Sequence, residues 1–191
     1  MAKSRRRARE LALRALYEMD ITKVNPDKVL NDAVHGQEVH IDQLRYAERI
    51  VRGFHDHANY VDETLALRIK EYDFQRIAAI DRAILRIATY ELFFEPAIPP
   101  AVTLNEAIEI AKKYSTAESG KFVNGVLGRV LADSEKAEWD PNSAPLEEED
   151  EPEALPQIEE LPDIEEVTIE ADSDEARSVA RIAGWKLRSD E

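Results

Sequence analysis

The sequence predicts an all-α fold, and three observations support this prediction. Apolar residues recur at helical spacing over most of residues 1–139. No segment shows the sustained apolar–polar alternation that is typical of a strand. Proline, glycine and capping residues stand between the periodic segments, where helices would begin and end. We therefore expect one helical body of ordinary domain size, followed by a tail of different composition.

The first predicted helix covers KSRRRARELALRALYEMD, residues 3–20. Its apolar residues form one stripe, made of Ala8, Leu11, Ala12, Ala15, Leu16 and Met19. The same stretch carries six cationic side chains, although a helix N-terminus holds about half a positive charge and disfavours cations. Helix formation therefore does not explain the arginines, whereas an anionic partner would.

Two further helical segments are expected in the next fifty residues. Pro26 starts a short helix that Gly36 ends. A longer periodic segment follows Asp42. Its apolar pattern shifts phase near residues 57–59 and then continues to about residue 70.

Three more helices complete the predicted body. A buried central helix is expected over residues 74–94, because this stretch is apolar on most sides and Asp73 could cap it. The next helix begins with Thr103 and Glu106, which have the spacing of a capping box. The last helix covers about residues 118–131.

The negative charge of the chain is concentrated in its tail. Residues 1–139 hold 21 basic and 22 acidic residues, whereas residues 140–191 hold 4 basic and 18 acidic residues. The whole chain has a net charge of −15. The low isoelectric point therefore does not exclude polyanion binding by the front part. Residues 140–172 are rich in Pro and Glu and are predicted to be a disordered linker, and residues 173–191 form a possible short amphipathic helix.

Several classes of protein are disfavoured by the composition. The chain has no Cys, so disulfides and thiolate metal sites are excluded. No apolar run approaches a membrane span, and we expect a cytoplasmic protein without membrane contact. His55 and His57 would stand about 200° apart on a helix and cannot share a metal there. No catalytic constellation stands out, so we predict neither an enzyme nor a cofactor or metal site.

The candidate site is a set of cations near the N-terminus, with a second group at the start of the last helix. Guanidinium groups suit phosphate bidentately, and cations gain affinity for nucleic acid by releasing counterions. The alternative is a solvated charged arm. In the second group Lys121 is a candidate phosphate contact, while Phe122 suits either the core or a base-stacking platform. The N-terminal candidates are Lys3, Arg5, Arg6, Arg7 and Arg9.

Four blocks taken together, RRRARELALRALYEMD, DRAILRIATYEL, NEAIEIAKKY and GKFVNGVLGRVL, resemble the NusB family of transcription antitermination factors over about residues 3–133. The resemblance implies two small three-helix bundles that share a long central helix. It also implies binding of boxA-type single-stranded RNA in nascent, chiefly ribosomal, transcripts. The implied protein partner is NusE, a small-subunit ribosomal protein, and the pair would help to assemble an antitermination complex on RNA polymerase.

The resemblance also assigns roles to particular residues. The arginine-rich RNA-binding motif falls on Arg5, Arg6, Arg7 and Arg9. The helix start near RNA falls on Lys121 and Phe122, with Glu118 at a usually acidic position beside them. Contact with NusE falls on Tyr17 and Asp81, the latter shorter than the Glu that is often found there.

Two other functions stay open as alternatives. The helical body could be a protein-interaction module that self-associates as a homodimer and contacts RNA only incidentally. An RNA-modifying enzyme is a third reading, because NusB-like domains also occur fused to RNA methyltransferases. This chain has no dinucleotide-type glycine motif after a strand and no length for a second catalytic domain.

Overall fold

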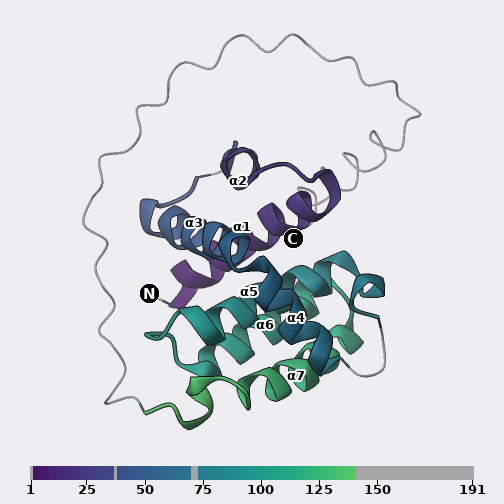
Figure 1. The fold of residues 1–191 in the computed structure, drawn as a ribbon. Helices are drawn as coiled ribbons and strands as arrows, with labels where there is room; N and C mark the ends of the chain where they lie inside the picture. Colours follow the sequence, from purple (N-terminus) through teal and green to yellow (C-terminus); the bar gives the residue numbers. More distant parts are fainter. Residues whose placement is uncertain (1, 37, 70–72, 141–191) are drawn as a thin grey trace. The chain divides into compact units, whose positions relative to one another are not determined.

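The computed structural model describes residues 2–36, 38–69 and 73–140, and this part of the chain is all-helical, as predicted (Figure 1). The predictions for residues 141–172 and 173–191 lie outside the described residues. The described elements are α1 (Ala2–Thr22), α2 (Pro26–Val34), α3 (Ile41–Asp56), α4 (Ala58–Arg68), the 3₁₀ turn η1 (Phe74–Arg76), α5 (Ala79–Phe94), α6 (Pro100–Tyr114), α7 (Ala117–Leu131) and the 3₁₀ turn η2 (Glu135–Glu138).

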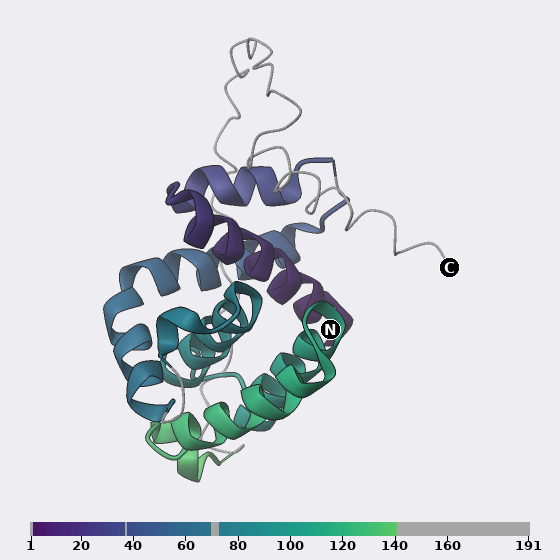
Figure 2. The same cartoon turned by 90° about the vertical axis from the view of Figure 1, so that its right-hand side faces the viewer.

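Helix α5 lies at the centre of this helical body. Helices α1, α2 and α3 pack against one another, and α7 packs against both α4 and α6. Helix α5 contacts α1 and α3 from the first group and α4, α6 and α7 from the second. The two views of the fold show this arrangement (Figures 1 and 2). The expectation of two helical groups around a shared central helix is therefore confirmed in its arrangement.

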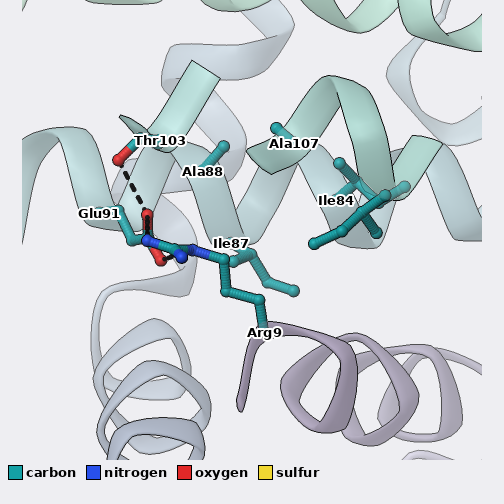
Figure 3. Close-up of a pocket in the computed structure, with 8 residues that line it drawn as sticks. Arg9, Ile84, Ile87, Ala88, Glu91, Thr103 and Ala107 are labelled. Atoms are coloured by element: carbon teal, nitrogen blue, oxygen red, sulfur yellow. Dashed lines mark hydrogen bonds and ion pairs between the residues drawn. The ribbon is translucent and has the colours of Figure 1, made fainter. Parts of the chain in front are cut away.

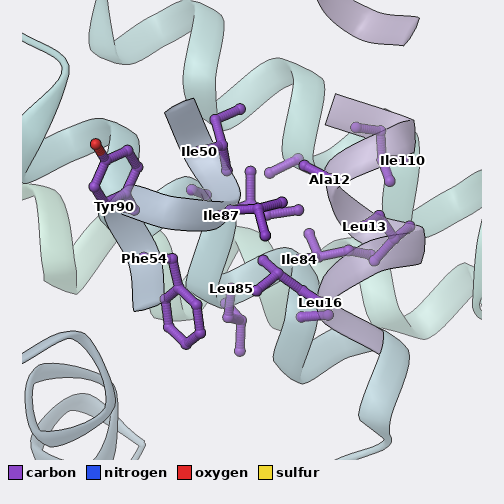
Figure 4. Close-up of a cluster of buried hydrophobic side chains, with 14 of the residues drawn as sticks. Ala12, Leu13, Leu16, Ile50, Phe54, Ile84, Leu85, Ile87, Tyr90 and Ile110 are labelled. Atoms are coloured by element: carbon purple, nitrogen blue, oxygen red, sulfur yellow. The ribbon is translucent and has the colours of Figure 1, made fainter. Parts of the chain in front are cut away.

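The core forms where α1 crosses α5. Leu13 and Leu16 of α1 are fully buried beside Ile84 and Ile87 of α5 (Figure 4). Burying one such side chain stabilises the fold by about 1.5–3 kcal/mol. The apolar stripe of the first helix is thus its inner face, which turns the charged residues of α1 outward or toward ion-pair partners.

The central helix is shorter than the sequence predicts. Asp73 does act as a cap, since its carboxylate accepts from the Gln75 amide, but it caps η1. The backbone is then extended at Ile77 and Ala78 before α5 begins. The carbonyl oxygens of Gln75 and Ile77 accept hydrogen bonds from Arg82 NH1, at 2.9 and 3.2 Å. These carbonyls therefore find a side-chain donor in place of helical amides.

The predicted capping box at the start of α6 does not form. Helix α6 begins three residues earlier, at Pro100, which has no amide hydrogen to satisfy and whose fixed φ suits a first helical turn. Thr103 lies inside the helix and donates to the Glu91 carboxylate. Glu106 binds Arg6 instead of the backbone. Both side chains of the expected box are thus used in contacts with other helices.

Two features of the sequence pattern correspond to helix ends in the first half. Gly36 follows α2 with a φ of +69°, a conformation that glycine adopts without strain. The phase shift near residues 57–59 corresponds to the break at His57, which separates α3 from α4. In the part of the chain that the structure describes, no helix is both long and apolar enough to cross a membrane.

The 3₁₀ turn η2 closes the end of the central helix. The Lys136 ammonium donates to the carbonyl oxygens of Glu91 and Ile98, both at 2.8 Å, and to that of Glu95. The Glu91 and Glu95 carbonyls also accept from the amides of Glu95 and Ile98, so Lys136 adds a second donor there, and a cation at a helix C-terminus suits the helix dipole. Burial lowers the pKa of Lys136 to about 8, against the opposing charges of Glu91 and Glu95.

Candidate nucleic-acid interface

Arg9 lies inside the protein rather than on its surface. Its guanidinium donates to both oxygens of Glu91, from Nε at 2.6 Å and from NH2 at 3.0 Å (Figure 3). Tyr46 and Thr103 donate to the same carboxylate, at 2.7 and 2.8 Å. Arg9 is 2% exposed and Glu91 is fully buried. The assignment of Arg9 to an RNA-binding surface is therefore corrected to a buried ion pair that joins α1 to α5.

Arg9 stays charged in the interior because the Glu91 carboxylate stabilises its guanidinium. Burial lowers the pKa of Arg9, but the Glu91 carboxylate outweighs it, and the net pKa is raised. A buried charge that loses its partner is strongly destabilising, so the pair acts as one structural unit. Sequence reasoning missed Glu91. The signal available was an acid within a helix that is apolar on most sides.

A second set of ion pairs holds the other end of α1. Asp20 accepts from Arg82 Nε at 3.0 Å and from Arg86 NH1 at 3.2 Å. Arg86 also makes a bidentate pair with Asp62 of α4, at 2.7 and 2.8 Å. Burial raises the pKa of Asp20, but the hydrogen bond from Arg82 and the charge of Arg86 outweigh it and leave the pKa lowered. Helix α1 is thus fixed against α5 near both ends.

Ion pairs also join α1 to α6, and in these pairs the acidic side chain is less exposed than the basic one. Arg6 donates to Glu106 from Nε at 2.7 Å and from NH2 at 2.8 Å. The side chain of Arg6 is 46% exposed and that of Glu106 only 14%. Glu10 accepts from Lys113 at 2.8 Å and from Arg7 at 3.4 Å, and it is likewise covered. The hydrogen bond from Arg6 lowers the pKa of Glu106.

The basic end of α6 continues this surface toward α7. A Cβ atom at Gly120 would lie 3.2 Å from Lys112 Cγ, so the Lys112 stem packs against α7 at Gly120, and the next residue along α7, Lys121, is exposed. The start of α1 meets this same part of the molecule (Figure 2). We use the name basic face for Arg6, Arg7, Lys112, Lys113 and Lys121. Sequence reasoning missed the two α6 lysines, because cations in a last helical turn already suit the helix dipole.

The remaining predicted RNA contacts have different surroundings. The Arg5 guanidinium lies 6.0 Å from the centre of the Tyr46 ring, in cation–π range. Glu118 is exposed in the first turn of α7. Phe122 is half-buried and packs against the core, which favours the core interpretation of that residue. The side chain of Lys3 lies outside the described part of the structure.

The two predicted partner residues lie on helix ends that meet. The Asp20–Arg82 pair joins the C-terminal part of α1, which carries Tyr17, to the N-terminal part of α5, which carries Asp81. Tyr17 is half-buried. Asp81 is 7% exposed and accepts from Ser119 Oγ at 2.9 Å, so its carboxylate joins α5 to the start of α7. Among the described residues, no group of three or more metal-ligating side chains is found.

Comparison with known proteins agrees with this architecture. The sequence profile of the NusB family matches residues 6–132. The transcription antitermination protein NusB of Symbiobacterium thermophilum is 40% identical over 136 residues, which cover 67% of this chain and 89% of the relative. The protein of the same name from Geobacillus kaustophilus is 39% identical over 132 residues, covering 69% and 98%. These names agree with the prediction of a transcription factor rather than an enzyme.

Two solved structures are similar in fold. T. maritima NusB matches with a TM-score of 0.66 and 35% identity, covering 71% of this chain and 97% of that one. The antitermination factors NusB and NusE in complex with dsRNA include a chain that matches with a TM-score of 0.65 and 27% identity, covering 70% and 99%. The fold, the sequence profile and these relatives lead to one conclusion: the chain belongs to the NusB family.

Proposed function

We propose that this chain is a transcription antitermination factor that binds boxA-type single-stranded RNA of nascent, chiefly ribosomal, transcripts together with NusE, and helps to assemble the antitermination complex on RNA polymerase. A factor that acts on nascent transcripts works in the cytoplasm. The observation that carries the proposal is the basic face, where cations come from three helices and the acids that pair with Arg6 and Lys113 are covered. A relative of similar fold forms a complex with NusE and dsRNA.

The basic face supplies the phosphate contacts in this proposal. Arg7 of α1 and Lys113 of α6 share Glu10 as their acidic partner, and Arg6 of α1 pairs with Glu106 of α6. With five cations meeting about five phosphates, log affinity falls with log salt at a slope near −3.5 for single-stranded RNA. Arg9 has no place in this contact, because it lies in the interior. Bases splayed from a single strand are the form of RNA most readable in sequence.

The protein partner is assigned to the joined ends of α1 and α5. Tyr17 is the accessible residue of the predicted pair there, while Asp81 supports that surface from within through Ser119. This location is separate from the basic face, which lies at the N-terminal half of α1. RNA and NusE could therefore bind at the same time.

The test is fluorescence anisotropy with labelled boxA-type RNA, with and without NusE, over a salt series. The variant Arg6→Ala/Arg7→Ala is expected to bind all RNA sequences more weakly. Arg52→Ala/Arg76→Ala is the matched control, because it removes two exposed cations outside the basic face. Equal affinity of wild type and Arg6→Ala/Arg7→Ala would refute the assignment.

The same preparation tests the competing function. Light scattering with and without NusE gives the oligomeric state of the chain. A stable homodimer that NusE leaves unchanged would favour a self-associating interaction module instead. Tighter binding of a duplex than of a single strand would change the RNA class.

A further inference from the structure

We propose that Glu106 is a positioning residue of the basic face, which holds Arg6 so that the outer edge of its guanidinium is presented to RNA phosphate. This goes one step beyond the proposed function, on which it rests. Glu106 is negatively charged and does not itself contact phosphate in this proposal. Its removal is therefore expected to weaken RNA binding even though the protein becomes more positive.

The geometry of the pair leaves one edge of Arg6 available. A guanidinium carries five N–H donors in a planar fork. Glu106 takes the Nε donor and one NH2 donor, at 2.7 and 2.8 Å, which together form the inner edge. The NH1 group has no partner among the described residues. NH1 and the second NH2 hydrogen form another edge with the spacing that suits two phosphate oxygens.

The difference in exposure between the Arg6 and Glu106 side chains indicates which way this edge of the guanidinium faces. Glu106 reaches up from α6 and is 14% exposed, whereas Arg6 lies above it and is 46% exposed. Helix α1 is itself fixed against α5 by Arg9 and Asp20. The base of the Arg6 side chain and its inner edge are therefore both held, and its outer edge faces solvent.

Two opposite effects on RNA affinity follow from this pair. Holding Arg6 removes most of the cost of ordering a long side chain when RNA binds. The carboxylate also cancels part of the positive potential that attracts RNA. We expect the ordering effect to be the larger one. The sign of the change in affinity on removing the carboxylate decides between them.

The experiment compares two carboxylate-to-amide variants on the same helix. Glu106→Gln is expected to weaken RNA binding on the order of three- to tenfold in the presence of NusE. Glu109→Gln makes the same change in charge one turn away, at a side chain that is 50% exposed and paired with Lys112. A lysine ammonium has no edge to orient, so Glu109→Gln is expected to tighten binding slightly. Urea unfolding of both variants shows that they are folded.

A second variant separates geometry from charge. Glu106→Asp keeps the charge but is one methylene shorter, so it cannot hold both donors of Arg6 in the observed position. Positioning predicts weaker RNA binding for Glu106→Asp, and simple neutralisation predicts no change. In an Arg6→Ala background, Glu106→Gln is expected to cause no weakening.

The possible results separate a failure of the Glu106 positioning role from a failure of the proposed RNA-binding function. Salt-sensitive RNA binding that Arg6→Ala weakens but Glu106→Gln tightens would overturn only the positioning role. Equal weakening by Glu106→Gln with and without Arg6 would overturn it as well, because the effect would then act through the fold. Absence of salt-sensitive RNA binding by wild type overturns the proposed function and this inference together.

Discussion

Arg9→Met separates the interior role of this arginine from the RNA-binding role that its place in an arginine-rich run indicates. The substitution leaves the buried Glu91 carboxylate with only the hydroxyl donors of Tyr46 and Thr103. Removing one partner of a buried ion pair costs about 3–5 kcal/mol. A domain of this size is stable by about 5–15 kcal/mol. The variant is therefore expected to lose about a fifth or more of its free energy of unfolding.

Urea unfolding followed by circular dichroism measures this loss, and an unchanged m-value shows that it reflects stability alone. Arg9→Met/Glu91→Gln is the informative companion, because a neutral amide can accept from one of the hydroxyls of Tyr46 and Thr103 and donate to the other. The double variant is expected to be more stable than Arg9→Met by about 2 kcal/mol. RNA affinity, measured where Arg9→Met is folded, is expected to match wild type. Normal stability with weakened RNA binding would refute the interior assignment.

Three further predictions concern the helical body and are checked by urea unfolding. Gly53→Ala places a Cβ atom against the Tyr90 hydroxyl, closer than atoms can approach, so Tyr90 must move and stability is expected to fall by about 1–3 kcal/mol; equal stability would show that Tyr90 moves without cost. Lys136→Met leaves the Ile98 carbonyl without a donor among the described residues, whereas the Glu91 carbonyl keeps the Glu95 amide, and the change is expected to cost about 1–3 kcal/mol; Lys136→Arg keeps the charge and tests whether charge alone preserves stability. Asp20 has a lowered pKa when folded, so its stabilising effect is present at neutral pH and is lost as pH falls below its ordinary value of 3.8; Asp20→Asn is therefore expected to differ from wild type at neutral pH and to approach it in acid, and a constant difference would contradict the ion pair with Arg82.

Local patterns predicted the helices well, because apolar periodicity reports which face of a segment is buried. The buried stripe of α1 was predicted in this way, and the break at His57 falls where the apolar pattern shifts phase. The start of α6 could not, because the spacing of Thr103 and Glu106 suits a capping box while both side chains are taken by residues of other helices. Spacing along the chain carries no information about such competitors.

The candidate site was predicted only in part, again because the sequence does not show which residues of other helices a side chain contacts. An arginine-rich run indicates a polyanion partner, but it does not say which arginine meets an acid 82 residues away, as Arg9 meets Glu91. The position of Arg9 beside the apolar stripe was the available signal. Lys113 belongs to the basic face because it binds Glu10 of α1, a contact that the sequence does not show.

The measurement that tests the central claim most directly is the salt dependence of affinity for boxA-type RNA in the presence of NusE. The basic face predicts a slope of log affinity against log salt near −3.5 for wild type. For Arg6→Ala/Arg7→Ala the slope becomes shallower by about 1.4, because two phosphate contacts are lost. A wild-type slope near zero, or equal slopes for the two proteins, would contradict the claim that these arginines bind RNA phosphate.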